Sequence, residues 1–180
     1  MSIILSDSNP NISSFWFDSF LELKPISNNE KNTKTAFLKI DTFINRQVTK
    51  ISKVDGTELR NNLIGYMRTS DVFSITEVKD FVFGSYVPHS QDIKMDTVKT
   101  NFDNHFINKS PVFDTQFQII PEVISAKVKN TYKVKSNVEL KTNGYINDLR
   151  RDIIAVRDDE GRYNLHILDV TAEVYESFKR

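Results

Sequence analysis

The sequence of 180 residues contains no cysteine, and this absence removes several classes of protein at once. Without a thiol, the chain can form neither a disulfide framework nor a thiolate zinc site, and it has no cysteine nucleophile. A chain without cysteine also fits a reducing compartment. Thiol chemistry therefore contributes neither to the fold nor to the function.

Glycine is also scarce, with only five residues in the chain. Because phosphate-binding loops and dinucleotide fingerprints place several glycines close together, neither motif can be drawn here, and no Gly-x-Ser-x-Gly elbow is present. The three histidines, His89, His105 and His166, lack the spacing of metal ligands. We expect no catalytic residue, no cofactor and no metal ion, although an enzyme built from dispersed residues stays open.

Long apolar runs are missing too, and the start of the chain lacks the basic residues and apolar core of a signal peptide. We therefore expect a soluble, cytoplasmic protein with no membrane partner. The length favours a single domain over residues 1–180, with a weaker boundary near 85–91. The 13 Phe and 6 Tyr residues supply bulk for a core.

Net charge is absent as well, because 24 basic residues balance 24 acidic ones. This argues against a dedicated non-specific nucleic-acid binder, which is usually strongly basic. The charge is uneven, however: residues 122–151 hold seven basic and three acidic residues, and residues 152–180 hold four basic and seven acidic residues. The pattern predicts two faces of one fold, an internal electrostatic match, or a basic binding surface beside an acidic one.

In the first half of the chain, alternating apolar residues predict strands at 35–44, 48–54 and 59–67, after a polar loop at 27–34. Asp55-Gly56 is a strong hairpin signal, so residues 35–68 are predicted to form a meander.

Two helices are predicted next. Ser74 and Glu77 have the spacing of a capping box and predict a helix at 75–83, with a strand as the alternative because Phe81 to Phe83 are β-prone. An apolar repeat at steps of three and four predicts a helix over 92–108. The repeat consists of Met95, Val98, Phe102 and Phe106.

The second half predicts strands at 115–120, 123–129, 132–140, 152–157 and 163–168, with turns at Asn143-Gly144 and at Asp158 to Gly161. A short helix over 172–178, capped by Thr171, follows. The whole order predicts an α+β fold: a mostly antiparallel sheet (meander plus C-terminal hairpins) with one or two packed amphipathic helices. An open barrel stays as an alternative.

Lysines alternate with apolar residues from Ile124 to Lys135, which would place Lys127 and Lys129 on one sheet face. A cationic face beside an aromatic residue is typical of single-stranded nucleic-acid binding. The alternative is a solvated face on which lysine discourages edge-to-edge pairing. We call this candidate the lysine ladder, and it comprises Lys127, Lys129, Tyr132, Lys133, Lys135, Lys141, Arg150 and Arg151.

Three further sets of residues each allow two interpretations. The aromatic block at Phe15, Trp16 and Phe17 would be a protein interface if it is exposed, and core otherwise. Asp148 and Asp152 flank two arginines, which favours ion pairing over acid–base work. The acidic run at 158–160 favours a hairpin turn over a cation site.

These observations predict a non-enzymatic intracellular binding protein that acts through macromolecular interaction, with protein–protein interaction favoured. The partner would be another protein or a second copy of the chain. The alternative is a single-stranded nucleic-acid-binding protein that uses the lysine-rich sheet face at 122–151. A hydrolase with dispersed carboxylates is a third and weaker hypothesis.

Overall fold

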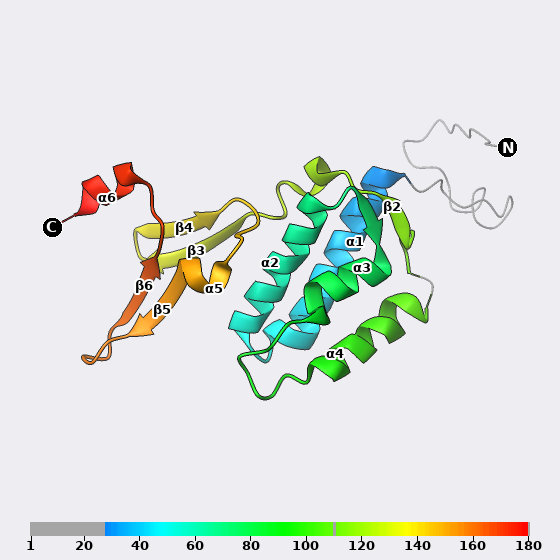
Figure 1. Ribbon diagram of the computed structural model, residues 1–180, viewed down its shortest axis with the longest axis horizontal. Coiled ribbons are helices and arrows are strands. Elements are labelled where there is room, and N and C mark those ends of the chain that lie inside the picture. Colours follow the sequence, from blue (N-terminus) through cyan, green and yellow to red (C-terminus); the bar gives the residue numbers. More distant parts are fainter. Residues whose placement is uncertain (1–27, 110, 180) are drawn as a thin grey trace, which may run out of the picture.

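The computed structural model describes residues 28–109 and 111–179, and its helices and antiparallel strand pairs confirm the predicted α+β class. Figure 1 shows two parts, which we call the helical body (residues 28–128) and the hairpin module (residues 129–179). The strands form three separate two-stranded antiparallel sheets and close no barrel within the described ranges, so the barrel alternative is wrong.

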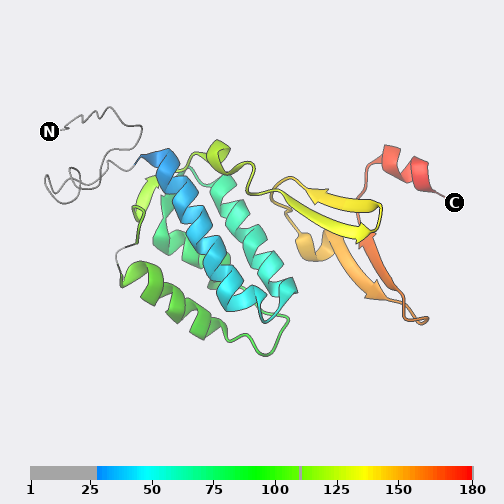
Figure 2. The same ribbon diagram turned by 180° about the vertical axis from the view of Figure 1, so that it is seen from behind.

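The helical body begins with two long helices joined by a π-helical turn. Asn28 caps the first by accepting the Lys31 N–H at 2.7 Å, and Ser52 caps the second by accepting the Asp55 N–H at 3.3 Å. The helices lie side by side in Figures 1 and 2. The elements are α1 (Asn29–Ile44), the turn Asn45–Thr49 and α2 (Lys53–Thr69).

The predicted meander over 35–68 is therefore wrong, and the described part of the predicted polar loop forms the cap and first turns of α1. The buried apolar side chains of α1 recur at helical spacing, at Ala36, Phe37, Ile40, Phe43 and Ile44. The Asp55-Gly56 signal lies in the first turn of α2, where Gly56 meets the side chain of Thr49 so closely that a Cβ would not fit. Glycine here serves a close approach rather than a hairpin.

The rest of the body confirms both predicted helices. Ser74 accepts the Glu77 N–H, as the capping box requires, and the second helix begins at Met95 rather than at 92. The predicted strand at 123–129 is wrong, because Pro121 begins a 3₁₀ turn there. The elements are β1 (Val72–Ser74), α3 (Ile75–Lys79) with the turn Asp80–Gly84, α4 (Met95–Phe102) with the turn Asp103–Ile107, β2 (Gln116–Gln118) and the turn Pro121–Ile124.

Aromatic rings from distant parts of the sequence form the centre of the body. Phe102 lies 5.5 Å from Phe43 and 5.4 Å from Phe83, measured between ring centroids. Phe73 stacks on Phe117, its partner across the β1–β2 pair, at 4.5 Å. Every buried apolar residue of the described chain lies between Ala36 and Val128. The core is thus confined to the helical body.

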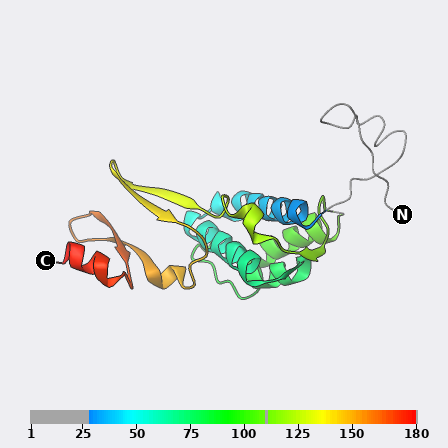
Figure 3. The same ribbon diagram turned by 90° about the horizontal axis from the view of Figure 1, so that it is seen from above.

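The hairpin module consists of two β-hairpins, which Figure 3 shows splayed apart, and a final helix. The predicted strand at 132–140 is itself a hairpin, while the second hairpin, its turn and the helix capped by Thr171 are confirmed. Gly161 has a φ of 81°, which favours glycine in that turn. The elements are β3 (Asn130–Lys135), β4 (Val138–Thr142), α5 (Leu149–Asp152), β5 (Ile153–Arg157), β6 (Tyr163–Ile167) and α6 (Ala172–Phe178).

Candidate functional site

One face of α2 joins the body to the module. Asn61 donates to the Ile146 carbonyl at 2.8 Å and accepts from the Ile146 N–H at 2.9 Å, so it pairs with the backbone as a neighbouring strand would. Gly65, one turn further along, lies against the ring of Tyr145, so a Cβ at Gly65 would clash with it. Glu58 lies on the same face of α2, one turn before Asn61.

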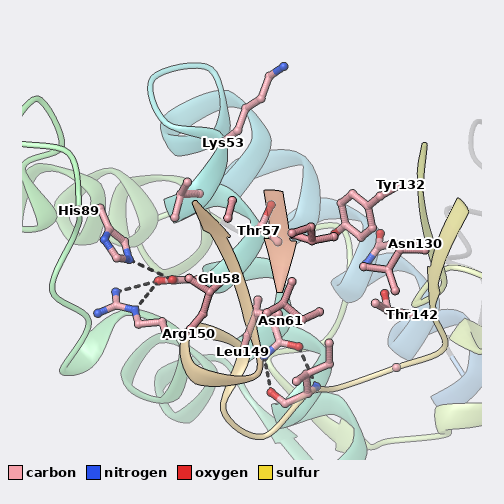
Figure 4. A pocket seen from close by; sticks show the side chains of 18 residues that line it. Lys53, Thr57, Glu58, Asn61, His89, Asn130, Tyr132, Thr142, Leu149 and Arg150 are labelled. Carbon is pink, nitrogen blue, oxygen red and sulfur yellow. Dashed lines mark hydrogen bonds and ion pairs between the residues drawn. The ribbon is translucent and has the colours of Figure 1, made fainter. Parts of the chain in front are cut away.

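Glu58 sits almost wholly buried at the centre of a group of charged and polar side chains, which we call the Glu58 cluster. Its Oε2 accepts from Arg150 Nε at 2.8 Å and lies 2.7 Å from the Tyr86 hydroxyl, and its Oε1 lies 3.0 Å from His89 Nε2. Figure 4 shows the His89 and Arg150 side chains converging on this carboxylate. The Glu58 cluster consists of Asp55, Glu58, Tyr86, His89 and Arg150.

Asp55 lies one helical turn before Glu58 and is fully buried. Its carboxylate accepts from the backbone N–H groups of His89 at 2.7 Å and Ser90 at 3.2 Å, and it lies 2.7 Å from the Tyr86 hydroxyl. Asp55 therefore holds the segment from Tyr86 to Ser90 against α2.

Opposing effects set the pKa values of both carboxyls. Burial raises the pKa of Asp55, but hydrogen bonds from Ser52, Tyr86 and the backbone hold it below its ordinary value. Burial likewise raises the pKa of Glu58, and the contacts with Arg150, Tyr86 and His89 hold it below its ordinary value. Both groups are therefore anionic at neutral pH.

Tyr86 is placed between these two anions. Burial, followed by its contacts with Asp55 and Glu58, raises the pKa of Tyr86, so the hydroxyl keeps its proton. A phenol has a single proton, so it shares one donor between two carboxylates that both lie within hydrogen-bond distance. The arrangement stabilises two neighbouring negative charges.

Arg150 brings α5 into the cluster. Besides Glu58, it donates to the Val87 carbonyl at 2.9 Å, and its guanidinium lies 5.2 Å from the centroid of the Tyr86 ring. The Glu58 carboxylate is thus satisfied by three partners from two other segments. Its chemistry is that of a paired structural charge rather than of a free general base.

Beside the cluster, a groove of about 650 Å³ opens between α2 and the two hairpins (Figure 4). Its walls are mostly apolar, with Lys53, His89 and Arg150 among the lining residues. Tyr132 and Leu140, which face each other across the β3–β4 pair, line one side, and Ala155 and Leu165, paired across β5–β6, line the other. The remaining apolar lining comes from Val54, Ile146, Leu149, Ile153 and Ile154.

The hairpin module carries large apolar side chains without burying any residue. Tyr163 is 85% exposed and Phe178 is 80% exposed. Exposed apolar side chains in this number on one small module favour an interaction site. The other large apolar side chains of the module that are exposed are Tyr132, Val134, Val138, Ile154, Val156, Leu165, Ile167, Leu168, Val170, Val174 and Tyr175.

The structure divides the lysine ladder. Lys127 and Lys129 follow the 3₁₀ turn rather than lying on a strand, while Lys133 and Lys135 lie on β3. These four lysines form no ion pair with any residue of the described chain. Lys141 lies 3.3 Å from Glu139.

The two arginines of the ladder are engaged by carboxylates. Arg150 is held by Glu58, and Arg151 binds Asp152 and Asp169 at 2.8 Å each. Asp148 caps α5 by accepting the Arg151 N–H. The aromatic block at 15–17 lies outside the described residues.

Sequence reasoning missed the Glu58 cluster. With α2 interpreted as strands, Asp55 and Glu58 could not be recognised as neighbours on one helical face, and His89 was judged ordinary. The spacing of Asp55, Glu58, Asn61 and Gly65 was the available signal.

No family model matches the chain, and neither the curated proteins nor the solved structures contain a significant match. In the described ranges, no helix is long and apolar enough to cross a membrane, and no group of three or more His, Asp or Glu side chains converges as metal ligands.

Proposed function

We propose that this chain is a non-enzymatic cytoplasmic protein that binds another protein chain through its hairpin module. The observation that carries the proposal is that residues 129–179 bury no side chain, yet expose a long series of apolar ones. Isolated two-stranded hairpins are marginally stable in water, and they gain stability when a hydrophobic face is covered. A protein partner would supply that cover.

The composition of the exposed face favours a protein as the partner. Tyrosine and phenylalanine are enriched at protein interfaces, and the module exposes Tyr132, Tyr163, Tyr175 and Phe178. The module also exposes charges of both signs, such as Lys135 and Asp159. A mixed rim around aromatic residues suits a protein surface better than a polyanion.

Single-stranded nucleic acid is the second candidate. Its support is that Lys127, Lys129, Lys133 and Lys135 have no carboxylate partner among the described residues. Against it, Arg150 and Arg151 are already neutralised by acidic side chains, and the whole chain has no net charge.

The experiment is affinity capture from extracts of the native cell, with the full chain as bait. We would compare wild type, a Tyr163→Ser/Val156→Ser variant of the module, and a Val112→Ser control. Val112 is 73% exposed but lies on the helical body. We expect a partner that the module variant loses and the control keeps. A partner retained by the module variant would contradict the proposal, as would no captured chain at all.

A further inference from the structure

The last helix of the module packs against no surface among the described residues of its own chain. Each residue of α6 is exposed, including Val174, Tyr175 and Phe178, which lie on one side of the helix by their spacing. Figures 1 and 3 show α6 standing away from the rest of the molecule. An exposed apolar face on a helix is typical of a surface that binds a partner.

The same chain contains the groove between α2 and the two hairpins. Its walls are mostly apolar. Arg150 and His89 are paired there with Glu58, which also lines the groove, and Lys53 is the lining cation that forms no ion pair with the described residues. The charged positions of α6 are acidic, at Glu173 and Glu176, of which Glu176 pairs with Lys179. Helix and groove therefore match in both apolar character and charge.

We propose that the chain forms a dimer in which α6 of each copy lies in the groove of the other. This rests on the proposed function and names the protein partner as a second copy. Residues 130–151 hold five basic and two acidic residues, and residues 152–179 hold three basic and seven acidic residues. Five of those seven acidic residues pair within the chain, so the charges left for a second copy are Asp159 and Glu173 on the acidic half and Lys133 and Lys135 on the basic half. A two-fold axis brings the acidic half of one copy to the basic half of the other.

The start of the connection between β6 and α6 is held by hydrogen bonds to α5. The Leu168 N–H bonds to the Asp152 carbonyl at 2.9 Å, and Asp169 accepts from Arg151 at 2.8 Å. Asp169 has a φ of 53°, a left-handed conformation that redirects the chain. Only Val170 and Thr171 remain between this anchored point and α6.

The test is sedimentation equilibrium of the full chain from about 1 to about 100 µM, the range in which weak association becomes visible. Two variants attack the two sides of the contact. Phe178→Gln removes the most exposed aromatic residue of α6. Val54→Asp places a carboxylate in the groove, at an exposed position in the first turn of α2 where acidic residues favour helices. Val112→Asp on the body is the matched control.

We expect wild type and the control to dimerise, and each of the other two variants to dimerise at least about tenfold more weakly. Circular dichroism confirms that each variant is folded.

Two results would overturn the proposal: a monomer over the whole range, or a dimer indifferent to both variants. A monomer whose captured partner is lost in the Tyr163→Ser/Val156→Ser variant would remove the second copy while keeping the protein-binding function. A monomer without any captured chain would remove both.

Discussion

Arg150 Nη2 lies 2.7 Å from Glu58 Oε2, so a guanidinium of the hairpin module contacts a buried carboxylate of the helical body. The pair joins α5 to α2, and through Tyr86 and His89 it also reaches the segment that follows α3. This one contact connects three parts of the sequence that lie far apart.

Arg150→Met should therefore weaken the attachment of the module. It leaves the Glu58 carboxylate buried with fewer donors, and we expect a loss of about 1–3 kcal/mol in the free energy of unfolding. Urea denaturation measures the loss. Arg151→Met is the control, because Arg151 is itself exposed and ion pairs of exposed side chains contribute about 0–1 kcal/mol. Equal losses in the two variants would contradict the account.

Acid should destabilise the body through the same cluster. The pKa values of Asp55 and Glu58 lie below their ordinary values of 3.8 and 4.5, so their contribution is present above those values and is lost as pH falls through the folded-state pKa. We expect the urea midpoint to decrease below about pH 4.5. The urea midpoint of the Asp55→Asn/Glu58→Gln double variant should decrease less over the same pH range. If the midpoint of this variant decreased as much as that of wild type, other carboxyls would be the cause, which would contradict the account.

Phe102→Ala tests the core. Phe102 is fully buried among Phe43, Phe83 and Phe106, so we expect a loss of about 3–5 kcal/mol in the free energy of unfolding. Ile107→Ala, at a side chain that is 41% exposed, is the control and should cost far less. A loss below about 1 kcal/mol for Phe102→Ala would contradict the packing of α4.

The elements of the fold that could be predicted from the sequence are those specified by residues close together in the chain. The β5–β6 hairpin and the α4 helix were predicted because turn residues and a regular apolar repeat specify them within a few residues. The helices α1 and α2 were mispredicted as strands because their β-branched and aromatic residues raise strand propensity. Burial against elements distant in the sequence selects the helix instead. Asp55-Gly56 misled for the same reason, since its role depends on Thr49 in the preceding turn.

The candidate site was likewise predicted only in part from the sequence. Tyr132 was singled out beside the lysines, and it lines the groove. Arg150 was predicted as a binding cation, whereas its partner Glu58 lies 92 residues away in the sequence. Contacts over such a separation follow from the tertiary fold and leave no local pattern.

Reversing the charge of the unpaired lysines separates the two candidate functions. The triple variant Lys127→Glu, Lys129→Glu and Lys133→Glu should leave stability within about 0.5 kcal/mol, because these side chains are exposed. Binding of wild type to labelled single-stranded DNA and RNA at low and moderate salt is the measurement. The protein-binding account predicts no salt-sensitive affinity. Such affinity, abolished in the triple variant, would favour the nucleic-acid function instead.

The central claim is that the hairpin module requires cover from another chain, and hydrogen exchange tests it most directly. Backbone amides of β3 to β6 would be followed in the purified chain at low and high concentration, and with any captured partner added. We predict rapid exchange in the uncovered module, because its strands bury no side chain, and clear slowing when the partner is bound. Slow exchange at every concentration without a partner would show that the module is stable alone, and it would contradict the account.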